Sequence, residues 1–193
     1  AELLQVDLPD EFDRYKQFAS QLSKKLMNEI TAQKQLLAAE NNELQAYLEK
    51  TNSISIIKDV IDVYQNYNIS KDKEIITDKN SVNINFRTDK SILGRILSNL
   101  LKNALEASKN DKLIIIGCAE IENEIQFWIK NESYIPTEVQ LQIFQRSFST
   151  KGSGRGIGTY SVKLLTEKYL KGSVSFKSTK EDGTTFFVNL PKN

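Results

Sequence analysis

Residues 89–110 read "DKSILGRILSNLLKNALEASKN" and combine an apolar face with an unusual polar one. The apolar residues recur every three or four positions, a spacing that predicts an amphipathic helix packed on a core. The apolar arc consists of Leu93, Ile96, Leu97, Leu100, Leu101, Ala104 and Leu105. The opposite arc consists of Arg95, Asn99, Lys102, Asn103 and Glu106.

The two asparagines of the polar arc are the first chemical signal. Asn99 and Asn103 are four residues apart and Glu106 follows three later, so all three project from one side. Asparagine inside a helix costs roughly 0.5 kcal/mol relative to alanine, and a solvated face is normally built from Lys, Glu and Gln. The residues leave two interpretations open: a merely solvated face, or amide oxygens that coordinate Mg²⁺ beside substrate phosphates.

A second signal is the segment 149–160, "STKGSGRGIGTY". Glycine-rich backbone ahead of a helix start favours an anion such as phosphate, although turn glycines in a surface loop give the same pattern. Neither a P-loop nor a Rossmann pattern fits the spacing. The glycines are Gly152, Gly154, Gly156 and Gly158, with the cations Lys151 and Arg155 among them.

Composition narrows the classes of function. The 193 residues carry a net charge of +1, which argues against a nucleic-acid partner bound by bulk charge. The chain has no histidine, which excludes Ser-His-Asp arrangements and histidine-ligated metals within it. A single cysteine, Cys118, favours a reducing, cytoplasmic setting. Because the chain opens without Met, we expect a piece of a longer protein, which can itself be membrane-anchored.

Residues 7–40 are predicted to form one long helix with an apolar stripe too wide for solvent. The stripe favours partner helices in a bundle or coiled coil, with packing on the chain's own domain as the alternative. The stripe consists of Phe12, Tyr15, Ala19, Leu22, Leu26, Ile30 and Leu37, with Phe18, Met27 and Leu36 beside it. We therefore divide the chain into a helical domain at 1–40, a linker at 41–53 and a globular domain at 54–193.

The globular part alternates helix and strand patterns. The predicted fold is α+β: a two-layer α/β sandwich whose mixed sheet is covered by helices on one face. Helices are predicted at 56–67, 89–109, 137–144 and 158–170. Strands are predicted at 82–86, 112–120, 124–130, 172–178 and 184–191.

Together, three segments resemble the ATP-binding domain of two-component sensor histidine kinases. Their superfamily also includes type II topoisomerases, mismatch-repair ATPases and heat-shock chaperones. "ILSNLLKNALEA" (96–107) looks like the family's N box, and "DGTTFFVNLP" (182–191) like its closing strand. "YIPTEVQLQIFQRSFSTKGSGRGIGTYSVKLL" (134–165) is similar to its ATP lid and second glycine box. The resemblance covers residues 54–192 in the family's order.

The resemblance implies that the site binds ATP and Mg²⁺. Asn103 would ligate Mg²⁺ through its side-chain oxygen, with Asn99 beside it. Thr184 and Asn131 would lie at the adenine end of the nucleotide. The remaining implied ATP-binding residues, on the helix, in the lid and at the following helix start, are Lys102, Lys151, Gly152, Gly154, Arg155, Gly156 and Gly158. Phe144 and Phe148 either anchor the lid or are ordinary core aromatics.

Several positions depart from the family pattern. ATP-hydrolysing branches carry a glutamate where this chain has Asn99, and an amide cannot act as a general base, so phosphoryl transfer is favoured over hydrolysis. Asn131 stands where the family has the adenine-binding aspartate, which replaces a charge-assisted hydrogen bond with one about half as strong. Ser133 replaces a glycine of the same box, and Thr159 replaces a leucine after the last lid glycine.

Two placements of the N-terminal helix compete. In the first, Lys24 occupies the phosphoacceptor position and the protein is a degenerate kinase. In the second, which chain length favours, residues 10–40 are the second helix of the dimerisation hairpin and the acceptor histidine lies outside this chain. The second placement predicts a homodimeric histidine kinase core that signals to a response-regulator receiver domain. Rival functions are a nucleotide-independent scaffold and a serine/threonine kinase of the anti-sigma type.

Overall fold

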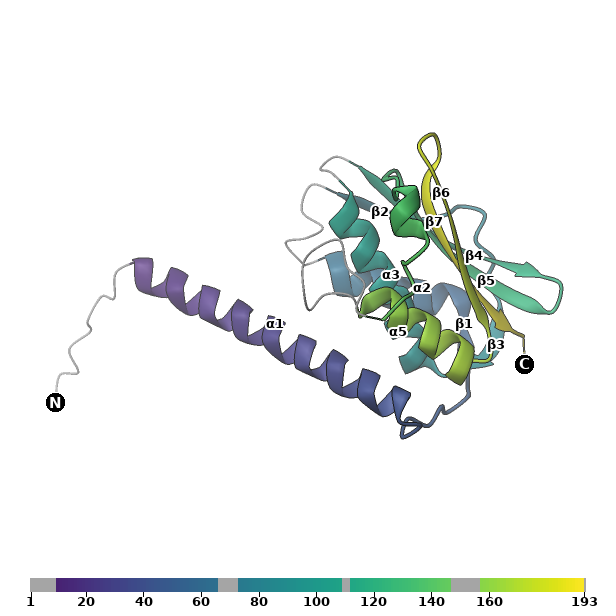
Figure 1. Ribbon diagram of the computed structural model, residues 1–193, viewed down its shortest axis with the longest axis horizontal. Helices are drawn as coiled ribbons and strands as arrows, with labels where there is room; N and C mark the ends of the chain where they lie inside the picture. The colour runs from purple at the N-terminus through teal and green to yellow at the C-terminus, as the bar shows by residue number, and fades with distance from the viewer. Residues whose placement is uncertain (1–9, 66–72, 109–111, 147–156, 193) are drawn as a thin grey trace. The chain divides into compact units, whose positions relative to one another are not determined.

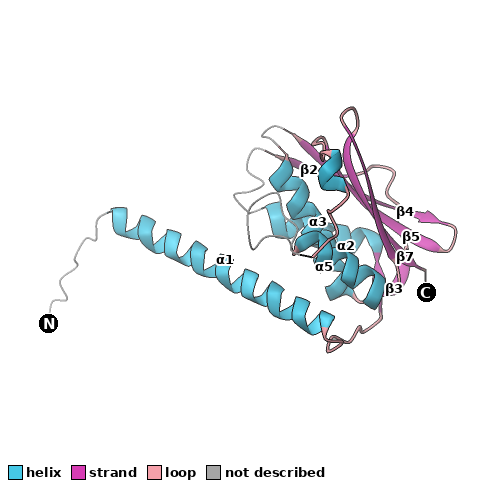
Figure 2. Ribbon diagram, in the orientation of Figure 1, coloured by secondary structure: helices cyan, strands magenta, loops and turns pink. Residues whose placement is uncertain are grey.

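A computed structural model of the protein describes residues 10–65, 73–108, 112–146 and 157–192. The chain divides into two compact units, Ala1–Leu44 and Gln45–Asn193. Figures 1 and 2 show the helices and strands of both units.

The described part of the first unit is built on helix α1 (Asp10–Glu40). Its start lies within the predicted range 7–40, and residues 7–9 fall outside the described residues. Large apolar side chains along α1 are each more than 40% exposed: Phe12, Tyr15, Phe18, Leu22, Leu26, Met27, Ile30 and Leu37. The helix therefore carries a long apolar stripe on its surface, while its role in dimerisation stays a prediction.

The second unit contains a five-stranded sheet in the order β2-β4-β5-β7-β6. Strand β2 runs parallel to β4 and the other pairs are antiparallel, so the predicted mixed sheet is confirmed. Its strands are β2 (Glu74–Thr77), β4 (Leu113–Ile121), β5 (Glu124–Asn131), β6 (Ser173–Thr179) and β7 (Gly183–Pro191). Strand β2 was not predicted, because its four residues are too few to show a period of two.

Helices cover one face of this sheet, which confirms the two-layer sandwich (Figures 1 and 2). Helix α2 (Ser53–Gln65) packs on β2 and β4, and α3 (Lys90–Ala107) packs on β4 and β5. Helix α5 (Gly158–Leu164) continues into a π-helical turn, η2 (Leu165–Tyr169), and both pack on β6.

Two predicted elements differ in extent. The helix expected at 137–144 is a single turn, α4 (Thr137–Gln140), followed by turns. The strand expected at 82–86 is β3 (Asn85–Thr88), which forms a separate two-stranded sheet with β1 (Glu49–Asn52). The shift arises because Ser53 holds the preceding residues: its hydroxyl donates to the Val82 carbonyl at 2.6 Å and accepts the Ile84 N–H at 3.0 Å.

The core lies between α3 and the sheet. Every residue of the predicted apolar arc of α3 is buried, from Leu93 to Leu105. On β5, Ile125, Phe127 and Ile129 are buried while the residues between them are only half-buried, as the alternation of a strand requires. The polar arc of α3 is therefore held away from the core.

The start of α3 is fixed by a buried carboxylate. Asp89 is the N-cap, and its Oδ1 accepts the N–H of Ile92 at 2.9 Å. Its Oδ2 accepts the N–H of Tyr47 at 2.9 Å, which ties the segment before β1 to the same helix end. One side chain thus satisfies two backbone donors.

We expect Asp89→Ala to lower the free energy of unfolding by about 1–2 kcal/mol, because both N–H groups lose their acceptor. Asp89→Asn should cost less, since an amide oxygen still accepts from Ile92. Urea unfolding measures both. The control is Asp62→Ala on the exposed side of α2, expected within about 0.5 kcal/mol of wild type. An Asp89→Ala variant as stable as that control would contradict the capping role.

Candidate functional site

The polar arc of α3 provides one wall of the candidate site. Asn99 and Asn103 are partly exposed, while their apolar neighbours on the helix are buried. Arg95 lies one turn before Asn99 on the same arc, and burial lowers the pKa of its guanidinium. Arg95 was predicted to lie on this arc but was not assigned to the site, although its spacing of four residues from Asn99 indicates a shared face.

The structure brings Asn103 against the last lid glycine. A Cβ placed on Gly158 would lie 3.6 Å from Nδ2 and 3.7 Å from Oδ1 of Asn103. Gly158 is the first residue of α5, and α5 packs against α3. The predicted metal ligand and the predicted phosphate-binding backbone thus meet, although they lie on separate helices.

Gly158 is the one described member of the predicted glycine set. Lys151, Gly152, Gly154, Arg155 and Gly156 lie outside the described residues, as does Phe148. Their roles stay predictions.

The described segments on both sides of 147–156 are attached to the globular unit. The hydroxyl of Thr159 donates to the main-chain carbonyl of Ile143. Phe144 packs edge-on against Phe176 and Phe186, with ring centroids 5.8 and 6.3 Å apart. Thr159, a departure from the family pattern, therefore joins the start of α5 to the chain that enters the lid.

Lys102 has a competing contact. Its Nζ lies 4.0 Å from Oε1 of Glu106, one turn further along α3, and both side chains are partly exposed. An exposed pair of this kind stabilises a helix by only about 0.3–0.5 kcal/mol. Lys102 can exchange this partner for a phosphate at little cost, and its role in ATP binding stays a prediction.

The two residues predicted for the adenine end are direct neighbours. Asn131 ends β5 and is paired with Thr184 of β7 in the antiparallel register. Both side chains are buried. The hydroxyl of Thr184 donates to the Ser133 carbonyl at 2.6 Å and lies 2.7 Å from Oγ of Ser178. Thr184 is thus committed to protein partners and helps to shape this end of the site.

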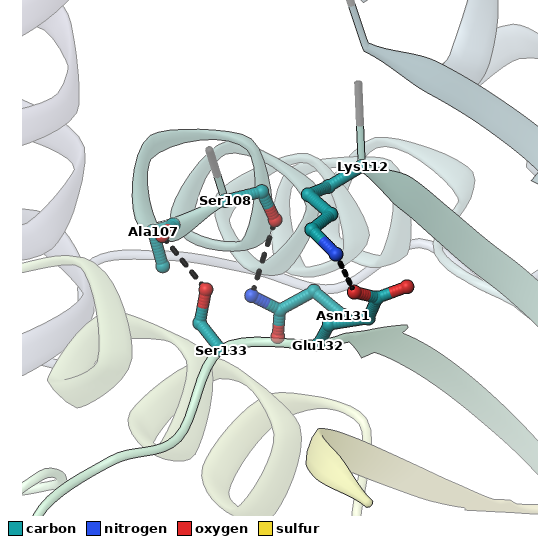
Figure 3. A network of polar contacts seen from close by, with 6 residues as sticks. All are labelled: Ala107, Ser108, Lys112, Asn131, Glu132 and Ser133. Atoms are coloured by element: carbon teal, nitrogen blue, oxygen red, sulfur yellow. Dashed lines mark hydrogen bonds and ion pairs between the residues drawn. The ribbon is translucent and has the colours of Figure 1, made fainter. Parts of the chain in front are cut away.

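Polar contacts connect the end of β5 to the C-terminus of α3 (Figure 3). Nδ2 of Asn131 donates to Oγ of Ser108 at 3.3 Å, and Oγ of Ser133 donates to the Ala107 carbonyl at 2.7 Å. Ser108 follows Asn103 by five residues, which is about 7.5 Å along a helix axis. Asn131 of β5 therefore contacts the end of the helix that carries Asn103.

This arrangement fits a nucleotide whose phosphates complete the coordination of a metal. The described residues contain no group of three or more His, Cys, Asp or Glu side chains that could hold a metal ion by themselves. Mg²⁺ is commonly bound by one or two protein oxygens together with substrate phosphates. Asparagine can provide such an oxygen, and a neighbouring glycine backbone leaves room for the phosphates.

In the described part of the chain, no helix is long and apolar enough to cross a bilayer.

The chain matches known proteins in sequence and in fold. Residues 88–193 match the family model described as "Histidine kinase-, DNA gyrase B-, and HSP90-like ATPase". The heme sensor protein HssS of Staphylococcus aureus (strain Newman) is 30% identical over 157 residues, covering 80% of this chain and 34% of that protein. This chain spans about a third of the length of the curated relatives it matches.

Two solved structures share the fold. The histidine kinase ThkA, in complex with the response regulator protein TrrA, has a TM-score of 0.69 at 22% identity, covering 97% of this chain and 53% of that chain. Full-length ShkA, in complex with AMPPNP, has a TM-score of 0.76 at 17% identity, covering 95% and 39%.

Close backbone packing at the Asn131 end predicts a sharp difference between two glycines. Gly183 has φ +76°, and a Cβ there would lie 2.2 Å from the Asn131 carbonyl oxygen. Gly183→Ala should therefore lower the free energy of unfolding by about 2 kcal/mol or more. Gly94→Ala, within α3 and with nothing within 4 Å of its Cβ position, should raise it by up to about 1 kcal/mol. Thermal unfolding compares the two variants. Equal shifts of their melting temperatures would contradict the close backbone packing at Gly183.

Proposed function

We infer that this chain, which belongs to the family of histidine kinase-, DNA gyrase B- and HSP90-like ATPases, is the ATP-binding part of a sensor histidine kinase core. The observation that carries the proposal is the position of the Asn103 amide, which lies 3.6–3.7 Å from the place that a Cβ on Gly158 would take. It joins the two features that a Mg-nucleotide needs: an oxygen ligand for the metal and a main chain that phosphates can approach.

The chain's own residues would bind and orient the nucleotide and its Mg²⁺. Asn103, with Asn99 beside it, holds Mg²⁺; Asn131 and Thr184 form the adenine end. The bound ATP would supply the γ-phosphoryl group that is transferred. Backbone and cations surrounding the phosphates neutralise their charge, which is the main protein contribution to phosphoryl transfer. The residues proposed for this role are Lys102, Lys151, Gly152, Gly154, Arg155, Gly156 and Gly158.

The proposed reaction is transfer rather than hydrolysis. Asn99 occupies the position at which hydrolysing members carry a water-activating glutamate, and an amide has no proton-accepting group of suitable pKa. The acceptor is a histidine outside this chain, and a receiver-domain aspartate takes the group next. ThkA, solved with the response regulator TrrA, and ShkA, solved with the ATP analogue AMPPNP, support this proposal by analogy.

The helical unit fits a dimeric kinase. The exposed apolar stripe of α1 needs a partner surface, and a second copy of this helix in a hairpin bundle provides one. We propose residues 1–40 as part of the dimerisation domain, 41–53 as the linker and 54–193 as a cytoplasmic ATP-binding domain. The same stripe also suits the alternative of a nucleotide-independent scaffold, in which α1 recruits a partner while the nucleotide site is empty.

Calorimetry with Mg-ATP tests the site directly. Wild type should bind, and Asn103→Ala should weaken binding about tenfold or more, because the metal loses its protein ligand. With ATP and excess chelator, the difference between the two proteins should largely disappear. The matched control is Asn123→Ala, an exposed asparagine in the β4–β5 turn, expected to bind like wild type. Absence of Mg-ATP binding to wild type would refute the kinase proposal and favour the scaffold.

Phosphotransfer in trans separates the kinase classes. With γ-labelled ATP, this chain alone should stay unlabelled because it has no histidine. With the preceding helix of the full-length protein supplied, an acid-labile label should form on that helix, and Asn103→Ala should abolish it. Label on serine or threonine would support the anti-sigma type. Label on Lys24, within α1, would support the degenerate kinase, and release of free phosphate would contradict the role assigned to Asn99.

A further inference from the structure

We propose that Ser108 is a specificity-determining residue, which fixes the orientation of the Asn131 amide so that the site selects a purine with an amino group at position 6. The inference rests on the proposed function, because it assumes that a nucleotide base lies at Asn131. It goes beyond that function by assigning the selectivity to a residue that does not itself contact the base.

The hydroxyl proton of Ser108 is committed within α3. Its Oγ lies 2.8 Å from the main-chain carbonyl of Ala104, and a carbonyl oxygen can only accept a hydrogen bond. Ser108 therefore donates to Ala104, and the remaining capacity of its Oγ is that of an acceptor.

This commitment decides which way the Asn131 amide faces. Nδ2 of Asn131 lies 3.3 Å from Oγ of Ser108, and the amide must present its NH₂ group there because Oγ has no proton left to give. The reversed amide would place two acceptor oxygens against each other. Figure 3 shows the nitrogen directed at Ser108 and the oxygen directed away from it.

Neighbouring hydroxyl groups leave the amide oxygen without a protein donor. Ser133 donates to the Ala107 carbonyl at 2.7 Å, and Thr184 donates to the Ser133 carbonyl at 2.6 Å. Within the described residues, no donor reaches Oδ1 of Asn131. Asn131 and Ser108 are only 5% and 7% exposed, and Oδ1 of Asn131 keeps a small opening through which a base can reach it. The site therefore presents one oriented acceptor.

An oriented acceptor distinguishes purines. The 6-amino group of adenine donates to it, whereas the 6-carbonyl of hypoxanthine would face it with a second acceptor. A carboxylate at position 131 would need no such orientation, because both of its oxygens accept. An amide does need it, since a freely turning amide could offer NH₂ to a 6-carbonyl. Ser108 thus supplies the discrimination that the Asn131 amide does not provide alone.

The test compares ATP with inosine triphosphate, both as Mg complexes, by calorimetry. Wild type should favour ATP about tenfold or more, because a buried acceptor left unpaired is costly. Ser108→Ala should reduce this preference to about threefold or less, with inosine triphosphate gaining affinity as the amide turns. Ser108→Thr keeps the hydroxyl and should restore the preference. Ser108→Cys, whose thiol is a weak donor, replaces the alanine variant if that one unfolds.

A double-mutant cycle isolates the mechanism. In an Asn131→Asp background, Ser108→Ala should leave the preference for ATP unchanged, because a carboxylate accepts in either orientation. An equal loss of both nucleotides in Ser108→Ala would mean a merely structural role and would overturn the inference. Equal binding of both nucleotides by wild type would overturn it while leaving the kinase proposal intact. Absence of binding of either nucleotide to wild type would overturn both.

Discussion

Burial of one face of α3 is the constraint on which the rest of the site depends. The apolar arc from Leu93 to Leu105 is packed against β4, β5 and the neighbouring helices, so α3 cannot rotate about its axis without exposing core residues. Asn99 and Asn103 consequently lie on the side of α3 that faces away from the core. The start of α5 lies beside the Asn103 amide, which is 3.6 Å from the place that a Cβ on Gly158 would take, and the polar arc therefore faces the candidate site.

The same helix organises both ends of that site. Asn103 meets Gly158 near the middle of α3, whereas Asn131 and Ser133 are held at its last turn through Ser108 and Ala107. At the last turn, a helix has carbonyl groups without intrahelical partners, and Ser133 donates to one of them, that of Ala107. The Ser108 hydroxyl adds a second donor to the Ala104 carbonyl, which already accepts the Ser108 N–H. The hydrogen bonds that complete the helix end therefore also position the residue proposed to read the base. Helix termination and the proposed base recognition share one small set of hydroxyl groups.

Helices and strands with a long hydrophobic period were predicted correctly, whereas short elements without one were missed or predicted with the wrong length. The apolar arc of α3 and the strands β4, β5, β6 and β7 were predicted close to their observed bounds. Strand β2 was missed because Glu74–Thr77 is short, and its parallel pairing with β4 joins segments separated by all of α3. The helix expected at 137–144 stops after Gln140 because Phe144 is used to pack on Phe176 and Phe186 instead. In the second case a tertiary contact overrode local preference, whereas β2 had no local pattern long enough to detect.

The sequence by itself determined which chemical groups this protein offers: two asparagines on one helix face, a glycine series before another helix, and no histidine. Spacing along the chain fixes which residues share a face, since helix and strand geometry is local. Only the tertiary structure decided that Asn103 lies beside Gly158, that Asn131 pairs with Thr184, and that Ser108 orients the Asn131 amide. Those contacts depend on cross-strand register and helix packing between distant segments, which no local period encodes.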